Sequence, residues 1–372
     1  MKFGVNALRL SGQRLGIGRY IEYLLKDWDT MLEAGERVVV YVREPFDKAE
    51  LGLSEAFEVR HLPSWHDGVR WEHFVLARHW RETDVLFCPS YTVPLHYRGR
   101  LVVATHSVNE AEPGSHPWWY HLTYRQRNKL SARRSDAVIV PSQTTEGHVE
   151  DLYGVPSEKI TIVPEGAPRS FAPVRDEAVL RETRRRYLGD DVPYVLFVGK
   201  ASQRRNIPAL IEAFARVKRR HRIPHKLLLF GPNILDLPLS ELTDRLGVSE
   251  SVVQTDGRIQ RHEDILPVYS GADLFVHPTT AEGFSLTIVE AMACGLPVVT
   301  VGRGVVAEIV GEAAITVDAP TPEQLEEAIW RVLSSSELRA DLGKKAIERS
   351  QLFRLDATAR GTLDVMRQVG RA

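Results

Sequence analysis

The sequence has few cysteines, no excess of either charge and no long hydrophobic run. Its two cysteines, Cys88 and Cys294, lie far apart in apolar surroundings, which argues against a disulfide framework and favours a reducing compartment. Basic and acidic residues number 48 and 49, so we expect no nucleic-acid partner. No apolar run approaches the ~20 residues of a membrane span, and the first residues lack the apolar core of a signal peptide. These absences predict a cytoplasmic protein.

Metal-binding patterns are missing as well. No cluster of His, Cys and Asp has the spacing of a metal site. The Asp-x-Asp sequence at Asp27 and Asp29 lies inside an amphipathic helical pattern, where carboxylates at i and i+2 point in different directions. We therefore expect neither a metal nor a cofactor.

The chain has 372 residues, of which 43% are hydrophobic, enough for two domains. Short apolar runs alternate with amphipathic stretches, and several runs are uniformly apolar, as in parallel strands covered on both faces. The alternation occurs twice, which predicts an α/β fold of two doubly wound domains. The boundary falls in the proline- and glycine-rich stretch 164–176.

The expected strands span 2–6, 37–42, 84–88, 101–105, 137–140, 160–163, 194–199, 226–231, 252–255, 273–277 and 297–301. The expected helices span 17–33, 69–81, 118–134, 143–152, 206–221, 239–246, 262–270, 285–294, 322–333 and 336–352.

The most informative stretch is 282–299, EGFSLTIVEAMACGLPVV. It predicts a loop, a short helix and a buried strand, with Ser285 as the N-cap and Gly295 as the helix stop. Glu282 lies in the loop before the helix, and Glu290 lies one to two turns inside it. This layout brings a carboxylate and free backbone N–H groups to one edge of a sheet, where a phosphorylated ligand can dock.

A second candidate site follows the apolar strand that ends at Gly199. Lys200 and Arg205 lie in the next loop, beside the start of a helix. Side-chain charge, helix dipole and amide donors add together there, which predicts an anion site. The alternative is that Arg204 and Arg205 are solvated loop charges.

Two features of the first domain have either a structural or a ligand-binding role, and the sequence does not decide between them. Gly16 and Gly18 lie in the fragment GIGRYI, which lacks the third glycine of a dinucleotide fingerprint because Ile21 stands there. A structural turn and a phosphate-binding loop both fit. His106 follows the strand 101–105, so a ligand-facing imidazole and a structural histidine both fit.

The stretch 117–134 mixes aromatic and basic residues. Such a segment can touch a membrane surface or an anionic acceptor. The favoured interpretation is a helix whose aromatic end packs inward and whose cations face water. Peripheral contact with the inner face of a membrane stays as the alternative.

Taken together, these motifs resemble the glycosyltransferases of family four, which are retaining, depend on nucleotide sugars and have the GT-B fold. The resemblance runs over most of the chain, and its motifs are GIGRYIEYLL, ATHS, SDAVIVPSQTT, KITIVPEG, FVGKASQRRN, LLLFG, GADLFVHPTTAEGFSLTIVEAMACGLPVVT and EIVGEAAITVD. It implies two Rossmann-like domains that face each other across a cleft. The first, 1–168, would bind the acceptor; the second, 169–354, would bind the nucleotide sugar; and a helix at about 355–372 would pack back on the first.

The resemblance also implies roles for single residues. Glu290 matches the ribose-binding glutamate, Glu282 matches the glutamate set against the transferred sugar, and His106 matches a histidine near the sugar's distal hydroxyl. The turn whose amides reach the sugar and the diphosphate matches Gly283, Phe284, Ser285 and Leu286. The diphosphate-binding strand end and cations match Gly199, Lys200 and Arg205, and the loop that closes over the phosphates matches Gly16 and Gly18. The expected catalytic set is Glu282, His106, Lys200 and Arg205.

Several residues depart from the family's common pattern. Lys200 precedes Arg205, whereas the usual order is Arg then Lys, and a point charge and a fork differ in geometry. Ser285 replaces a frequent glycine, Ser107 a frequent aspartate and Glu165 a common asparagine. None of these changes removes an obvious catalytic group, but together they bear on the identity of donor and acceptor.

The resemblance implies transfer of a sugar from a nucleoside diphosphate to a glycan, a lipid-linked or a small-molecule acceptor, with retention of configuration and without metal. The base of the donor stays open, as does the role of Glu282 as nucleophile, electrostatic support or sugar ligand. Two alternatives remain. One is a GT-B-like phosphorylase or nucleotide-sugar epimerase, and the other is a binding subunit with a decayed site.

Overall fold

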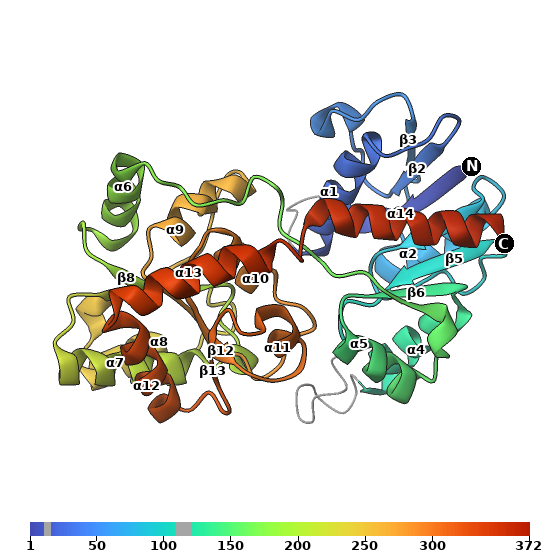
Figure 1. Ribbon diagram of the computed structural model, residues 1–372. Coiled ribbons are helices and arrows are strands. Elements are labelled where there is room, and N and C mark those ends of the chain that lie inside the picture. Colours follow the sequence, from blue (N-terminus) through green and yellow to red (C-terminus); the bar gives the residue numbers. More distant parts are fainter. Residues whose placement is uncertain (11–15, 109–120) are drawn as a thin grey trace. The chain divides into compact units, whose positions relative to one another are not determined.

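The computed structural model describes residues 1–10, 16–108 and 121–372. The chain divides into two compact units (Figure 1). The first consists of Met1–Gly166 together with Leu355–Ala372, and the second of Ala167–Arg354. Each is an α/β unit built around one sheet.

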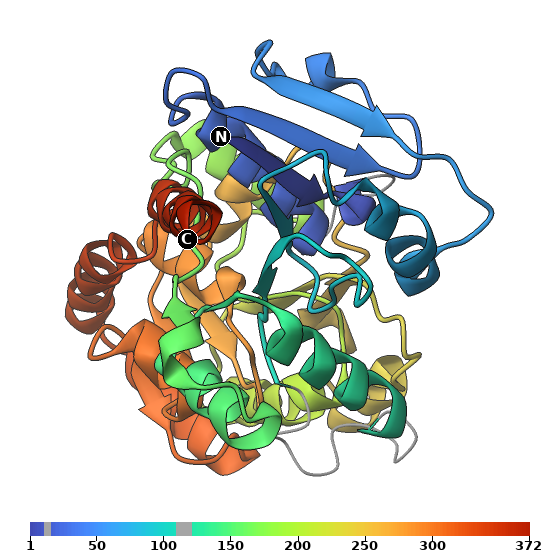
Figure 2. The same ribbon diagram turned by 90° about the vertical axis from the view of Figure 1, so that its right-hand side faces the viewer.

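The first unit contains a seven-stranded parallel sheet of order β3-β2-β1-β4-β5-β6-β7. Figure 2 shows β1, β2 and β3 as adjacent blue arrows of one direction. The strands are β1 (Lys2–Asn6), β2 (Arg37–Val42), β3 (Phe57–His61), β4 (Val85–Cys88), β5 (Arg100–Ala104), β6 (Ala137–Val140) and β7 (Ile160–Ile162). The helices are α1 (Ile17–Asp29), α2 (Gly68–Phe74), α4 (Gln126–Arg134), α5 (Gln143–His148) and α14 (Leu355–Arg371). Shorter helical segments are η1 (Leu8–Leu10), η2 (Lys48–Leu51), η3 (Leu76–His79), η5 (His121–Arg125), η6 (Val149–Tyr153) and η7 (Ser157–Lys159).

The last helix of the chain, α14, completes the first unit. It packs on α1 and on β4, β5 and β6 (Figure 1). Trp28 is fully buried and donates a hydrogen bond of 2.8 Å from Nε1 to the carbonyl of Ala359. Arg367 pairs with the buried carboxylate of Glu36 at 2.7 Å. Apolar packing, the hydrogen bond of Trp28 and the ion pairs of Arg367 with Glu36 and Glu33 therefore join the first and last parts of the sequence.

The second unit contains a six-stranded parallel sheet of order β10-β9-β8-β11-β12-β13. The strands are β8 (Tyr194–Val198), β9 (Lys226–Phe230), β10 (Val252–Thr255), β11 (Leu274–His277), β12 (Val298–Val301) and β13 (Ile315–Val317). The helices are α6 (Glu177–Leu188), α7 (Ile207–His221), α8 (Leu239–Leu246), α9 (Leu266–Ser270), α10 (Leu286–Ala293), α11 (Gly304–Val310), α12 (Pro322–Leu333) and α13 (Ser336–Ser350). Shorter segments are η8 (Gln203–Arg205), η9 (Ser249–Ser251) and η10 (His262–Ile265).

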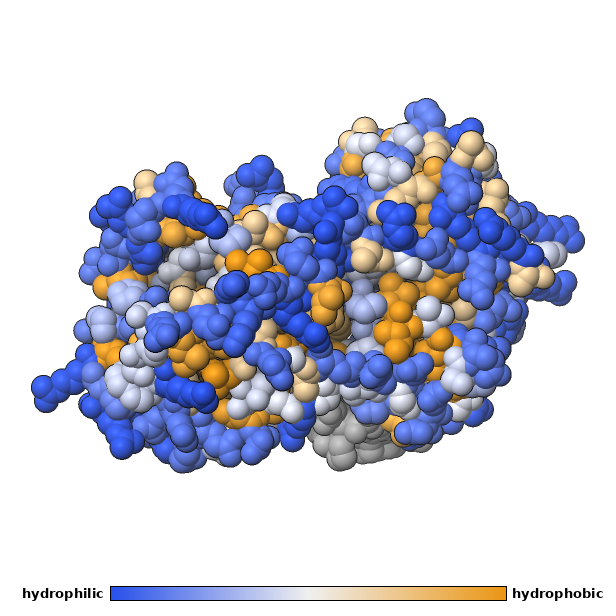
Figure 3. Space-filling view, viewed as in Figure 1, coloured by the Kyte–Doolittle hydropathy of each residue, from blue (hydrophilic) through white to orange (hydrophobic). Residues whose placement is uncertain are grey.

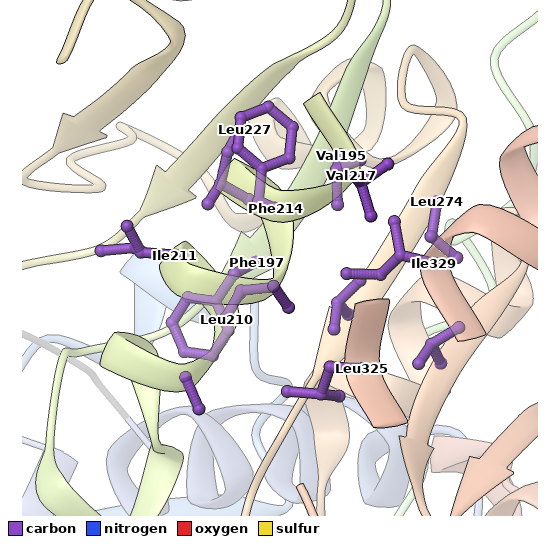
Figure 4. Packing of buried hydrophobic residues seen from close by; sticks show 14 of the residues in the cluster. Val195, Phe197, Leu210, Ile211, Phe214, Val217, Leu227, Leu274, Leu325 and Ile329 are labelled. Atoms are coloured by element: carbon purple, nitrogen blue, oxygen red, sulfur yellow. The ribbon is translucent and has the colours of Figure 1, made fainter. Parts of the chain in front are cut away.

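Both faces of the second sheet carry a hydrophobic core. On one face, Leu210 and Phe214 of α7 and Ile329 of α12 pack on Phe197 and Leu227 of the strands (Figure 4). A second cluster covers the other face. Burial on both sides explains why these strands are uniformly apolar, as the sequence predicts. The face drawn in Figure 3 is mostly hydrophilic, with hydrophobic residues in small groups. Over the residues described, no helix is long and apolar enough to cross a membrane.

The order of strands reverses once in each sheet. In the first unit the chain leaves β1 to one side and returns at β4; in the second unit the same change occurs between β8 and β11. Ligands of doubly wound sheets bind beyond the carboxyl ends of the strands at such a switch point. The segments after β1, β4, β8 and β11 are therefore the expected ligand-binding positions.

Two strands and two helices of the structure, β3, β13, α6 and α11, are not among the elements expected from the sequence. Strand β3 buries only Phe57 completely, so it lacks the apolar run of a central strand, and β13 has only three residues. Helix α6 buries only Leu180 and Leu188 among many charged residues. Helix α11, GVVAEIV, is almost uniformly apolar and so lacks a helical period.

Candidate functional site

The carboxylate of Glu282 lies at the switch point of the second sheet. Its side chain is 5% exposed, and Oε2 is 2.6 Å from Nη1 of Arg204. Its other oxygen lies 3.1 Å from Nε2 of His277, the last residue of β11, and 3.4 Å from the hydroxyl of Thr279. The loop after β11 and the turn η8 after β8 are thus joined through one carboxylate.

His277 is a neutral donor in this arrangement. Its ring is fully buried and stacks on Phe197 and Phe275, each at 5.8 Å between ring centroids. Burial lowers the pKa of His277 more than the neighbouring carboxylate raises it. Its Nε2 then carries the proton that is donated to Glu282, while Nδ1 has no hydrogen-bond partner among the described residues.

Glu282 is ionised despite its burial. Burial by itself raises the pKa of the carboxyl group, but the hydrogen bond from His277 and the charges of Arg204 and Arg205 lower it to about 2. Nε of Arg205 lies 3.7 Å from Oε1. A buried anion held by two cations is therefore a fixed part of this site.

Gly199 makes room for one of these cations. Its φ is +133°, and a Cβ atom there would lie 1.7 Å from Nη1 of Arg205. The guanidinium of Arg205 is half-buried, and burial lowers its pKa although Glu282 opposes this effect. Lys200, next in the chain, is exposed. A side chain at Gly199 would displace Arg205 from the strand end.

Two more glycines allow the backbone segments after neighbouring strands to lie in close contact. A Cβ atom on Gly231, after β9, would lie 2.2 Å from the carbonyl oxygen of Gly199. On Gly257, after β10, it would lie 2.8 Å from the Cα of Gly231. The ends of three neighbouring strands therefore meet as bare backbone, which allows a ligand to approach closely.

Ser285 begins α10, as predicted, but its side chain does not cap the helix. Its hydroxyl is buried and lies 3.4 Å from Nε2 of His277 and 3.4 Å from the hydroxyl of Thr287. Gly295 ends the helix with φ of +72°, which confirms the predicted stop. Phe284 packs near Phe353, with ring centroids 6.0 Å apart. Gly283 and Leu286 flank this turn, next to the first N–H groups of the helix.

Glu290 lies on the buried face of α10. The hydroxyl of Tyr269 donates a hydrogen bond of 2.8 Å to Oε2. Nε2 of His262 lies 2.9 Å from Oε1, and the His262 ring packs on Phe171 at 4.9 Å. Each carboxylate oxygen thus already has one partner within the second unit.

In the first unit, Gly16 and Gly18 open helix α1. Gly16 is the N-cap with φ of +51°, and a Cβ atom there would meet nothing within 4 Å. The positive φ, rather than crowding, is what favours glycine at this position. Gly18 lies buried in the first turn.

His106 is held by two acceptors. Its Nδ1 lies 2.7 Å from Oε1 of Glu165, and its Nε2 lies 2.8 Å from the carbonyl of Pro89. Tyr20 and Tyr91 contact the ring edge-on, at 5.0 and 5.5 Å between centroids. Burial lowers the pKa of His106, but the carboxylate and the carbonyl outweigh it, and the net shift is upward. Two acceptors require two ring protons, so the ring is an imidazolium.

The stretch 117–134 divides in the structure. Residues 117–120 lie outside the described residues, and η5 and α4 cover the remainder. Lys129, Arg133 and Arg134 donate to the backbone carbonyls of Leu152, Tyr153 and Tyr97 at 3.2, 2.6 and 2.7 Å. These three cations therefore fasten the helix to its own unit instead of only facing water.

Sequence reasoning missed several members of the site. They are Arg204, His277, Thr279, His262 and Tyr269, together with the role of Glu165 as partner of His106. His277 ends an apolar strand, which is a usable signal. The partners of Glu290 come from η10 and α9, 20 or more residues away in the chain, and nothing in the local pattern marks them. Within 1–10, 16–108 and 121–372, no group of His, Cys, Asp and Glu can hold a metal ion.

Comparison with protein families agrees with this geometry. The model of Glycosyltransferase Family 4 matches residues 15–171, and the model of Glycosyl transferases group 1 matches residues 181–349. Two parallel sheets with covering helices give the chain the GT-B fold. The chain belongs to the family-four, group 1 glycosyltransferases, as the resemblance of its motifs predicts.

Among curated relatives, the D-inositol 3-phosphate glycosyltransferase of Segniliparus rotundus is 27% identical over 79% of this chain and 66% of its own length. The O-antigen chain mannosyltransferase B of Escherichia coli is 26% identical over 67% of each protein. The chain thus spans about two thirds of the length of these relatives. Among solved structures, Anabaena HepE in complex with UDP and glucose has a TM-score of 0.80 at 20% identity, over 99% of this chain and 100% of that one. This likeness concerns the fold.

Proposed function

We propose that this chain transfers a sugar from a nucleoside diphosphate sugar to an acceptor, with retention of anomeric configuration and without metal. The observation that supports it most is the ionised Glu282 between Arg204, Arg205 and His277, at the switch point of the second sheet. A leaving diphosphate gains charge as the glycosidic bond breaks. Preorganised cations stabilise that charge in the transition state more than in the ground state.

The donor's diphosphate would bind between the two strand ends of the second unit. We assign its oxygens to Lys200, Arg205 and the N–H groups at the start of α10, near Ser285 and Leu286. The bare backbone at Gly199 lets the phosphates come close. These donors supply the positive charge that a metal ion supplies in other phosphate sites.

Glu290 would bind the ribose hydroxyls. A carboxylate has about four acceptor sites, and Tyr269 and His262 occupy one on each oxygen. The remaining sites can accept two ribose hydroxyls, while these two partners fix the orientation of the group. We expect the two partners to matter for nucleotide affinity and not for the transfer step.

Glu282 would act as electrostatic support and ligand of the transferred sugar. Both of its oxygens already accept hydrogen bonds or ion pairs, which reduces its strength as a nucleophile. The departing phosphate would then take the acceptor's proton on the same face of the sugar, which gives retention. Amides at Gly283 and Phe284 would bind sugar hydroxyls.

For the first unit, we assign acceptor binding. His106 would donate to a sugar hydroxyl, exchanging the Pro89 carbonyl for it, and Gly16 and Gly18 would contact the phosphates. The acceptor is a glycan, a lipid-linked saccharide or a small molecule, which gives the enzyme a place in glycoconjugate synthesis. Contact of the 117–134 stretch with the inner face of a membrane belongs to the lipid-linked case, and the protein would otherwise work in the cytoplasm.

A thermal-shift panel of UDP-, GDP- and ADP-sugars tests the donor, beginning with UDP-glucose because HepE binds UDP and glucose. We expect one base to raise the melting temperature, and EDTA to leave the shift and the turnover unchanged. NMR of the product's anomeric proton tests retention. Turnover with inorganic phosphate alone would identify a phosphorylase, and interconversion of donors without acceptor an epimerase. Absence of any donor hydrolysis or transfer would indicate a decayed site.

A further inference from the structure

One residue in the segment after β4 has a backbone conformation that its side chain does not favour. Tyr91 has φ of +65°, in the left-handed region, which costs free energy for a bulky L-residue. Three other non-glycine residues in the described part of the chain have a positive φ, namely Asn206, Arg222 and Asp236. Asn and Asp tolerate this region, and Arg222 ends α7, where a left-handed cap is common. Neither reason applies to Tyr91, so other contacts hold it in place.

The contacts that hold Tyr91 join it to the segment after β5. Its N–H donates a hydrogen bond of 3.1 Å to the carbonyl of Ala104, the last residue of β5. Its hydroxyl lies 3.1 Å from Oγ of Ser107. Its ring contacts the ring of His106 edge-on, with 5.5 Å between centroids and 74° between planes. Backbone, hydroxyl and ring thus each contact a different residue of the stretch 104–107.

The segment that contains Tyr91 is fastened at both of its ends. The carbonyl of the buried Pro89 accepts a hydrogen bond of 2.8 Å from Nε2 of His106. The hydroxyl of Thr92, also buried, donates at 2.8 Å to Glu72 on α2. Glu72 is itself buried and tied to the next strand, β1, since it accepts from Nδ2 of Asn6 at 3.0 Å. Buried anchors on either side can hold a residue at an unfavourable φ.

The ring contact matters most when His106 binds a ligand. In the proposed function, Nε2 of His106 exchanges the carbonyl of Pro89 for a sugar hydroxyl. Nδ1 then keeps its hydrogen bond to Glu165, but a single hydrogen bond leaves the imidazole ring free to tilt. The edge-on contacts with Tyr20 of α1 and with Tyr91 restrict that tilt from two different elements.

A role in the hydrophobic core does not account for the tyrosine. Over the described residues, the half-buried ring of Tyr91 belongs to neither hydrophobic cluster of the first unit, whereas Tyr20 is buried in one of them. A glycine at position 91 would adopt the same φ without strain. The contacts that explain a tyrosine here are therefore those with His106 and Ser107.

We propose that Tyr91 is a positioning residue of the transfer reaction. It holds the ring of His106 in the orientation in which Nε2 reaches a sugar hydroxyl, and it holds the hydroxyl of Ser107 beside that ring. This inference rests on the proposed function, because it needs His106 to bind a sugar hydroxyl. The effect of Tyr91 passes through His106 and not through the cations of the second unit.

Kinetics with the donor that the thermal-shift panel identifies test this role. Tyr91→Gly removes the ring and the hydroxyl and relieves the strained φ, so the fold should stay intact. We expect kcat to fall by about tenfold or more, whereas the affinity for the free nucleoside diphosphate, measured by calorimetry, should equal that of wild type. Tyr91→Phe keeps the ring and should lose less. Unchanged kcat in Tyr91→Gly, or an equal loss in Tyr91→Phe, would overturn the role of the ring.

Arg222→Gly is the matched control for the relief of strain. Arg222 also has a positive φ, is exposed at the end of α7 and belongs to none of the sites described above. Its replacement should leave kcat unchanged. A loss of kcat as large as that of Tyr91→Gly would show that backbone strain, and not the ring, affects turnover, and would contradict the proposal.

A double-mutant cycle shows whether Tyr91 acts through His106. In a His106→Ala background, Tyr91→Gly should cause no further loss of kcat, since the ring that Tyr91 positions is gone. Losses that multiply would indicate two independent roles and would contradict the proposal.

NMR of the full chain gives a readout that does not depend on turnover. The Nε2–H signal of His106 should be sharp in wild type and in Tyr91→Phe, and it should be lost through exchange with water in Tyr91→Gly. A signal that persists in Tyr91→Gly would contradict the positioning role.

The two proposals fail in different ways. If no nucleotide sugar binds to or reacts with the wild-type protein, the proposed function is wrong, whatever the signal of His106 does. If wild type transfers sugar and Tyr91→Gly does so at the same rate, only this inference is wrong.

Discussion

The two units have the same kind of sheet and each buries a carboxylate at its switch point, yet the two carboxylates have opposite chemistry. Glu282 faces Arg204 and a donating histidine, and its pKa is lowered to about 2. Glu72 accepts its hydrogen bonds from the neutral groups of Asn6 and Thr92. Burial raises its pKa to about 7, although the charges of Arg127 and Arg9 lower it in part. Both side chains are almost completely buried.

The difference shows that partners, and not depth, decide the charge of a buried acid. Burial raises both pKa values. At Glu282 a hydrogen bond from His277 and the charges of Arg204 and Arg205 outweigh this effect, whereas the charges of Arg127 and Arg9 lower the pKa of Glu72 too little to do so. The fixed anion of Glu282 organises the cations around it. A carboxyl group near neutrality can instead give or accept a proton in hydrogen bonds to hydroxyls. The same kind of sheet thus holds an ionised carboxylate in one unit and a carboxyl group that titrates near neutrality in the other.

Glu282→Gln should have the largest effect. It removes the anion that holds Arg204 and Arg205, so the cations lose their fixed positions toward the leaving group. We expect sugar transfer to fall by about 10²-fold or more, measured as initial rates at saturating donor. Glu327→Gln, an exposed glutamate on α12, is the control. A rate within twofold of wild type would show that the ion pairs of Glu282 with Arg204 and Arg205 do not contribute to the reaction.

Gly199→Ala should come next, because the new Cβ atom would overlap Nη1 of Arg205. We expect donor affinity to fall by about tenfold, measured by calorimetry with the nucleotide sugar. Gly247→Ala is the matched control, since Gly247 also has a positive φ but nothing within 4 Å of its Cβ position. If both variants lose donor binding equally, general backbone strain and not the position of Arg205 is responsible.

Glu165→Gln should produce a smaller, pH-dependent change. Glu165 and the Pro89 carbonyl raise the pKa of His106 above its ordinary value of 6.5, while burial raises the pKa of the neighbouring Tyr20, which stays neutral. The imidazolium, and the stability it contributes, are fully present below 6.5 and are lost as the pH rises through the raised value. The variant should therefore move the alkaline limb of activity and the NMR titration of His106 to lower pH. An unmoved titration would refute the pairing, and exposed Glu158→Gln is the control.

Glu72→Gln should have the smallest effect. Thr92 can turn its hydroxyl to the carbonyl of Ser90, 3.4 Å away, so an amide fits. In wild type the folded state keeps its proton between pH 4.5 and about 7, and stability declines there with rising pH by at most about 1.4 kcal/mol per unit. The variant should lack this decline, as measured by urea unfolding at pH 5 and pH 8. If the variant loses stability between pH 5 and pH 8 as much as the wild type does, Glu72 is not the group that titrates and the comparison fails.

Much of this architecture follows from local sequence pattern. Uniformly apolar runs predict the central strands, and the stretch around Glu282 and Glu290 predicts the loop and helix that carry them. The partners of these two carboxylates could not be predicted, because no sequence periodicity links Arg204 to Glu282 or His262 to Glu290. The unsatisfied cap of Ser285 has a similar cause, since a tertiary contact with His277 competes with the local hydrogen bond. Local rules fail where side chains from several strand ends meet.

Helix α14 also sets an order of events during synthesis. The first unit places Trp28 against the carbonyl of Ala359, so a hydrophobic face made early must wait until the rest of the chain has emerged. At ~5–20 residues per second, this delay lasts on the order of tens of seconds. The second unit, continuous in sequence, can complete its core first. The second unit, although synthesised after most of the first, is thus able to finish folding first. The first unit keeps an apolar surface exposed until α14 has been synthesised.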